Sequence, residues 1–109
     1  MEFVRVASLA EIPAGEVRAF ELPSGRVAVA HVDHRVFAVS DGCTHAGCPV
    51  SEGAVSADEV SVRCSCNDCV FDLENGEPLD GSATDPLPVY PVRLDDGWVE
   101  VGTEPGVQP

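Results

Sequence analysis

All five cysteines of this 109-residue chain lie between positions 43 and 69. They occur in two short segments, Cys43-Thr44-His45-Ala46-Gly47-Cys48 and Cys64-Ser65-Cys66-Asn67-Asp68-Cys69. In the first segment a thiolate and an imidazole are two residues apart, so both can bind at one site, and the second segment offers three more sulfurs. The spacing predicts a metal site shared by two loops, with the layout of an iron–sulfur site.

The cellular compartment expected for this chain favours cysteines that bind metal over cysteines that form structural disulfides. The first six residues lack a basic start followed by an apolar run, and no stretch approaches the roughly 18 to 20 apolar residues that span a bilayer. We therefore expect a cytoplasmic protein that does not enter the membrane. In that compartment, cysteines clustered in a short chain are more often metal ligands or redox-active thiols than structural disulfides.

The charge of the chain limits its partners. Nineteen acidic residues against six basic ones give a formal net charge of −13. Such a field repels phosphate backbones and anionic membranes, which argues against nucleic acid and membrane partners. It either steers the protein toward a basic patch on another protein or serves only solubility.

The elements that must hold the loops follow a period of two, which predicts strands. Beyond an opening strand, we expect strands at 17–22, 27–32, 35–39, 60–63, 70–73, 89–94 and 98–101. Turns are expected at Pro23-Ser24-Gly25, Asp33-His34, Glu74-Asn75-Gly76 and Asp95-Asp96-Gly97. One helical turn is predicted at the capping box Ser8-Leu9-Ala10-Glu11, and a stiff proline-rich loop at 81–91.

Short strands with frequent turns predict an all-β fold, an antiparallel sandwich or barrel. The length allows one domain, which we assign to residues 1–102, with a flexible C-terminal tail at 103–109. His31 and His34 are expected to be solvent-facing turn residues, whereas Trp98 and Tyr90 are expected in the core.

The cysteine segments and their surroundings resemble the Rieske ferredoxins. The resemblance rests on Cys-Thr-His-Ala-Gly-Cys, on Cys-x-Cys about twenty residues later and on Val70-Phe71-Asp72-Leu73-Glu74-Asn75-Gly76-Glu77-Pro78. It extends from the opening strand and Ile12–Glu16, through Pro86–Val92, to Asp96–Val101. It implies a Rieske-type antiparallel β sandwich or barrel with two metal-binding loops at one tip.

The same resemblance implies an electron-transfer protein rather than an enzyme. A [2Fe-2S] cluster with two Cys and two His ligands would carry single electrons from a flavin reductase to the terminal oxygenase of an aromatic-ring dioxygenase system. The expected partners are therefore protein redox partners, and we expect the carrier itself to be a monomer.

The ligand set departs from the family at one position. By resemblance, Cys43 and Cys64 bind the first iron and His45 binds the second. The family's second His corresponds to Asn67, whose amide is a weak ligand for iron in a sulfide cluster. Cys69 stands where the family often has a Ser bonded to a cluster sulfide, so either Cys69 or Asn67 could be the fourth ligand.

Two other interpretations remain open. The chain could be a Rieske-fold module that has lost its cluster, or it could hold a single Zn or Fe at Cys43, His45, Cys64 and Cys69. Cys48 and Cys66 match a pair that forms a disulfide in some Rieske proteins, and the alternative is two inert thiols. Phe71 is expected to pack over the second loop.

Overall fold

The structure, a computed structural model, describes residues 2–23, 25–42, 49–64, 69–81 and 85–106. Within these residues, strands form three antiparallel sheets, and no helix is long and apolar enough to cross a membrane. The predicted all-β class is confirmed.

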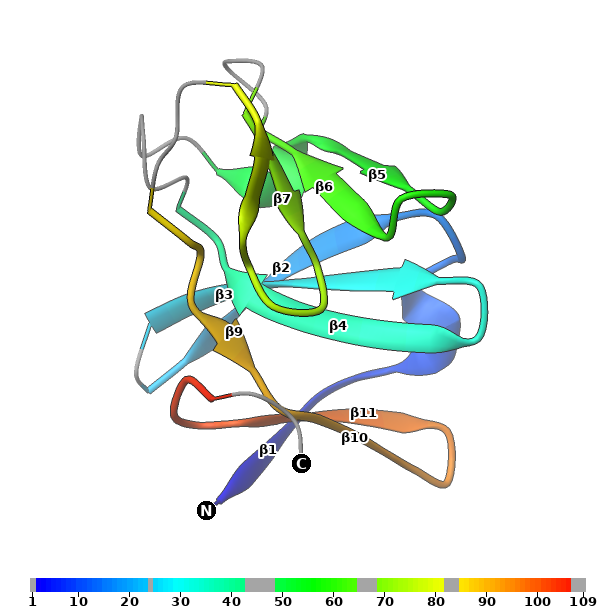
Figure 1. The fold of residues 1–109 in the computed structure, drawn as a ribbon. Helices are drawn as coiled ribbons and strands as arrows, with labels where there is room; N and C mark the ends of the chain where they lie inside the picture. The colour runs from blue at the N-terminus through cyan, green and yellow to red at the C-terminus, as the bar shows by residue number, and fades with distance from the viewer. Residues whose placement is uncertain (1, 24, 43–48, 65–68, 82–84, 107–109) are drawn as a thin grey trace.

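The sheets are as follows, in spatial order (Figure 1). The first contains β1 (Phe3–Ser8), β11 (Trp98–Gly102) and β10 (Val92–Asp95). The second contains β2 (Val17–Leu22), β3 (Gly25–Val32), β4 (Arg35–Ser40) and β9 (Val89–Tyr90). The third contains β5 (Ala54–Ser56), β6 (Ser61–Arg63), β7 (Val70–Asp72) and β8 (Pro78–Asp80). Two single 3-10 turns are η1 (Leu9–Glu11) and η2 (Val50–Glu52).

The second sheet is the middle layer, because β3 buries both of its faces. Val27 and Val29 join a lower core with residues of the first sheet, whereas Ala28 and Ala30 join an upper core with residues of the third. Side chains alternate across a strand, so the run of apolar residues in β3 supplies both cores. The upper core consists of Val17, Ala28, Ala30, Val32, Val39, Val50, Val62, Cys64, Cys69, Phe71, Leu73 and Leu87.

Several strand boundaries differ from the prediction for local reasons. Val60 has a φ of 50°, a conformation costly for a β-branched residue, so β6 begins one residue later than expected. Pro91 cannot donate a backbone hydrogen bond, and the strand expected at 89–94 is divided there into β9 and β10. The short strands β5 and β8 were not predicted.

Two side-chain predictions were wrong. Trp98 is 39% exposed, with the guanidinium of Arg5 4.9 Å from the centre of its ring. His31 lies within β3 and is half-buried, and its Nδ1 is 2.7 Å from the carbonyl oxygen of Ile12. This histidine therefore braces the segment before β2.

The predicted boundary at residue 102, between the domain and a flexible C-terminal tail, stays a prediction. Among the described residues beyond it, the N–H of Thr103 donates to the carbonyl of Glu2 at 3.0 Å, and that of Gly106 donates to Val89 at 2.7 Å. These bonds hold residues 103 and 106 against the first and second sheets.

A buried carboxylate joins the strands of the first sheet. Glu100, 7% exposed, accepts a hydrogen bond from Nε of Arg93 at 2.8 Å and lies 3.5 Å from the guanidinium of Arg5. The hydrogen bond from Arg93, assisted by the charges of both arginines, holds the pKa of Glu100 below its ordinary value, against the effect of desolvation.

This arrangement predicts a pH-dependent contribution to stability. Since the folded-state pKa of Glu100 is lowered, its stabilisation is complete above the ordinary carboxyl pKa and is lost as pH falls through the folded-state value. We expect Glu100→Gln to unfold at lower urea than the wild type at pH 7, with the difference shrinking in acid. Glu21→Gln, on an exposed residue of β2, is the control for the change in net charge. A difference that stays constant down to strongly acidic pH would contradict the assignment.

Candidate iron–sulfur site

The second cysteine segment is closed at its base by the β6–β7 pair. Arg63 pairs with Val70, and one residue further the N–H of Cys64 donates to the carbonyl of Cys69 at 2.8 Å. The ladder thus extends past both strand ends and holds the first and last cysteines of the segment opposite each other.

Both of these cysteines are buried. Cys64 is 2% exposed and Cys69 is 1% exposed, and both belong to the upper core. Phe71 belongs to the same core and is fully buried, whereas its predicted packing over the loop concerns residues 65–68, which lie outside the described residues. Two cysteine sulfurs placed opposite each other at the end of one strand pair can serve as ligands of a single metal site.

The first segment is closed in a similar way. Gly42 and Pro49 form an antiparallel bridge, and the N–H of Val50 donates to the carbonyl of Asp41 at 2.7 Å. The chain therefore leaves β4 and returns to the same place, where η2 begins.

The turn that follows the first segment is in backbone contact with the strand that leads into the second segment. Gly53, which follows η2, lies so close to β6 that a Cβ placed on it would be 1.8 Å from the carbonyl oxygen of Arg63. The next residue, Ala54, pairs with Arg63 in the third sheet, and Val50 shares the upper core with Cys64. The exit of the first segment and the entrance of the second are thus adjacent.

The structure therefore brings together the two predicted site residues that it describes, Cys64 and Cys69. The other predicted ligands, Cys43, His45 and Asn67, lie outside the described residues. No group of three or more His, Cys, Asp or Glu placed to hold a metal occurs among the described residues. The complete ligand set stays a prediction, as does the Cys48–Cys66 pairing, which also falls outside the described part.

Sequence reasoning missed two residues at this site. Asp41 is 3% exposed, and its side chain accepts a hydrogen bond from Ser51, which follows the first segment. Gly53 permits the close contact with β6 because it has no Cβ. The only sequence signals were an acidic residue just before Cys43 and a glycine shortly after Cys48.

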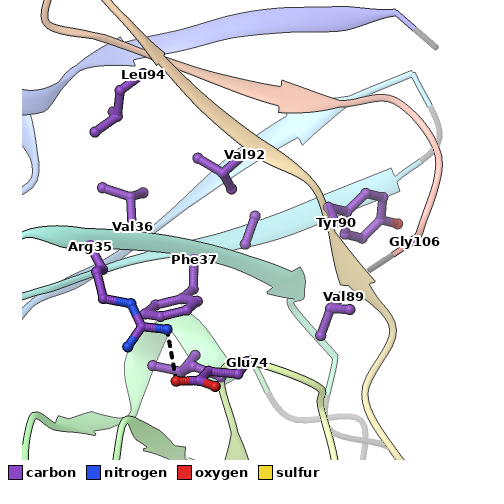
Figure 2. A pocket seen from close by; sticks show the side chains of 11 residues that line it. Arg35, Val36, Phe37, Glu74, Val89, Tyr90, Val92, Leu94 and Gly106 are labelled. Atoms are coloured by element: carbon purple, nitrogen blue, oxygen red, sulfur yellow. Dashed lines mark hydrogen bonds and ion pairs between the residues drawn. The ribbon is translucent and has the colours of Figure 1, made fainter. Parts of the chain in front are cut away.

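A cavity of about 550 Å³ lies elsewhere, between β4, β10 and the turn after β7 (Figure 2). Arg35 and Glu74 form an ion pair of 2.7 Å at its edge, and the guanidinium of Arg35 lies 4.7 Å from the centre of the Phe37 ring. Neither of the two described cysteines, Cys64 and Cys69, lines this cavity, and Glu74 follows β7 whereas Cys69 precedes it. The cavity is therefore separate from the described part of the cysteine site.

Comparison with known proteins assigns the class. The Rieske [2Fe-2S] domain matches residues 2–91, and the chain belongs to this family. It is 38% identical over 96 residues to the 3-phenylpropionate/cinnamic acid dioxygenase ferredoxin subunit of Photorhabdus laumondii, covering 88% of this chain and 90% of that subunit. The family and this relative indicate a [2Fe-2S] cluster as the cofactor and electron transfer, not catalysis, as the role.

Solved structures agree. The ferredoxin of carbazole 1,9a-dioxygenase from Nocardioides aromaticivorans superimposes with a TM-score of 0.91 at 27% identity, over 95% of this chain and all of that one. A complex of reduced oxygenase and oxidized ferredoxin in carbazole 1,9a-dioxygenase gives 0.88 at 26% identity, over 97% of each chain. The Rieske-type antiparallel fold expected from the sequence is confirmed.

Proposed function

We propose that this protein carries single electrons from a reductase to the oxygenase component of a dioxygenase system, through a [2Fe-2S] cluster held between its two cysteine segments. The observation that carries the proposal is the backbone contact between Gly53, which follows the first segment, and Arg63, which leads into the second, in a chain of the Rieske family. The cluster supplies a one-electron couple, and the protein's part is to hold its ligands in fixed positions.

The ligands we propose are Cys43, His45, Cys64 and Cys69. Cys64 and Cys69 fit a cluster because both are buried and held opposite each other by one backbone hydrogen bond. Asn67 does not fit as a fourth ligand, since its amide oxygen is a hard donor whereas thiolate is the soft donor that iron–sulfur clusters use. With three thiolates and one imidazole, the site carries more negative charge than one with two Cys and two His, which favours a lower reduction potential.

The partners are proteins. The related ferredoxin of carbazole 1,9a-dioxygenase forms a complex with its oxygenase, and we assign the same kind of partner here. The net charge of −13 supports fast, salt-sensitive encounter with a basic face on the reductase or oxygenase. We place the carrier in the cytoplasm, where its thiols would be kept reduced for cluster assembly, and we propose that it acts as a monomer.

Metal analysis and a reductive titration of the purified full chain test this function. We expect iron and acid-labile sulfide in equal amounts, visible absorption, and the uptake of one electron per cluster from dithionite under anaerobic conditions. Zinc or iron without sulfide would indicate a single-metal site, and a metal-free chain would indicate a module that has lost its cluster. Either result would overturn the proposal.

Restoring the family residue at position 67 gives a further prediction. If position 67 faces the cluster, Asn67→His should raise the reduction potential by on the order of 100 mV and make it pH-dependent near neutrality, because a neutral imidazole that can lose a proton takes the place of the Cys69 thiolate as the fourth ligand. Potentials measured by voltammetry between pH 6 and 9 check this. Asn75→His, on the exposed turn after β7, adds an imidazole elsewhere and should leave the potential unchanged. Identical potentials in the two variants would mean that position 67 does not reach the cluster.

A further inference from the structure

Asp41 occupies an unusual position for a carboxylate. It follows β4 directly, stands two residues before Cys43 and is 3% exposed. A buried carboxylate is costly unless each oxygen has partners. Asp41 has them on both oxygens, and they come from two other segments of the chain.

One set of partners lies beyond the first cysteine segment. Oδ1 of Asp41 accepts the N–H of Ser51 at 2.7 Å, and Oδ2 accepts the Ser51 hydroxyl at 2.9 Å. Ser51 belongs to η2, whose own N-cap residue, Pro49, makes no side-chain cap bond. Asp41 therefore caps η2 from the opposite end of the segment.

The other partner lies in the middle sheet. Nε of Arg26 in β3 is 2.8 Å from Oδ2 of Asp41, and the Asp41 N–H donates to the Arg26 carbonyl at 3.1 Å. The N–H of Val50 also donates to the carbonyl of Asp41. Asp41 therefore connects three parts of the chain: the residues before the segment, the residues after it and the central strand β3.

We propose that Asp41 is a positioning residue that clamps the point where the chain leaves β4 to the point where it returns at Pro49, and that this clamp strengthens metal binding by Cys43 and His45. This inference rests on the proposed function, because it takes Cys43 and His45 as ligands. Fixing both flanks of a chain segment in advance lowers the entropy that the segment loses when it binds metal.

The clamp is tested by the rate at which a chelator removes iron from the folded protein. In Asp41→Asn the amide nitrogen cannot accept from Arg26, so we expect iron release to be roughly tenfold faster or more, and the visible circular dichroism of the cluster to change. Ser51→Ala removes one of the three side-chain bonds and should accelerate release by a few fold. Glu74→Gln, which breaks the exposed Arg35–Glu74 pair with the same change of charge, should match the wild type.

Release rates in Asp41→Asn and Ser51→Ala within twofold of Glu74→Gln would overturn the proposal. If Asp41→Asn does not fold, Ser51→Ala decides alone. Amide exchange separates this inference from the proposed function, since the Val50 and Ser51 N–H groups bond to Asp41 in the described fold. If the wild type contains no cluster, the proposed function fails; faster exchange of these two amides in Asp41→Asn then still supports the clamp, and equal exchange overturns it.

Discussion

Replacing Gly53 with alanine should destabilise the fold and empty the metal site. A Cβ at this position would lie 1.8 Å from the Arg63 carbonyl oxygen and 3.0 Å from its carbonyl carbon. These are backbone atoms of β6, so no side-chain rotation relieves the overlap and the strand itself must move. Overpacking of this kind costs about 1–3 kcal/mol and occasionally more, and we expect the upper end of that range.

The metal site should also be affected, because Arg63 immediately precedes Cys64. Displacing it displaces Cys64 and the hydrogen bond from Cys64 to Cys69. Urea unfolding followed by circular dichroism measures the loss of stability, and iron content measures the loss of metal. We expect both to fall in Gly53→Ala.

Gly106→Ala is the matched control. Neither glycine has a positive φ, and nothing lies within 4 Å of a Cβ placed on Gly106. This variant should keep the stability and iron content of the wild type. A Gly53→Ala variant as stable as Gly106→Ala would show that Gly53 and Arg63 are not in backbone contact.

The sequence predicted the parts of the fold that depend on neighbours in the chain. Apolar segments bounded by turn residues located β2, β3 and β4 to within two residues, and Asp33-His34 located the hairpin between β3 and β4. Asp33 has a φ of 55°, which Asp tolerates better than most residues, so the turn signal had a physical basis. The chemistry expected of the site was likewise inferred from neighbours in the sequence, namely cysteines and a histidine a few residues apart.

What escaped prediction depends on contacts between distant segments. The role of Asp41 needs Arg26 and Ser51, which are brought to it by the β3–β4 pair and by the return of the chain at Pro49. The requirement for glycine at position 53 appears only when β6 is in place. Trp98 was wrongly assigned to the core because nothing in its strand pattern shows that its exposed face is covered in part by Arg5.

Cys69→Ser should release the cluster if Cys69 is the fourth ligand, the one assignment in which this chain departs from the family pattern. A serine oxygen is a harder and much weaker ligand for iron than a thiolate, so we expect most of the iron, sulfide and visible absorption to disappear. Cys64→Ser should have the same effect under any ligand set proposed here, which makes it the reference for complete loss. Iron and acid-labile sulfide analysis of the purified variants gives the comparison.

Loss of packing must be separated from loss of a ligand, because Cys69 is 1% exposed within the upper core. Val62→Ala removes volume from the same core beside Cys64 without removing a sulfur, at a cost of about 1–3 kcal/mol, and should retain its iron. Asn67→Ala completes the test: it should keep the cluster if Cys69 binds iron and lose it if the amide does. A coloured, sulfide-containing Cys69→Ser variant together with a colourless Asn67→Ala variant would show that the Asn67 amide, and not the Cys69 thiol, is the fourth ligand. That result would also contradict the expected lowering of the reduction potential.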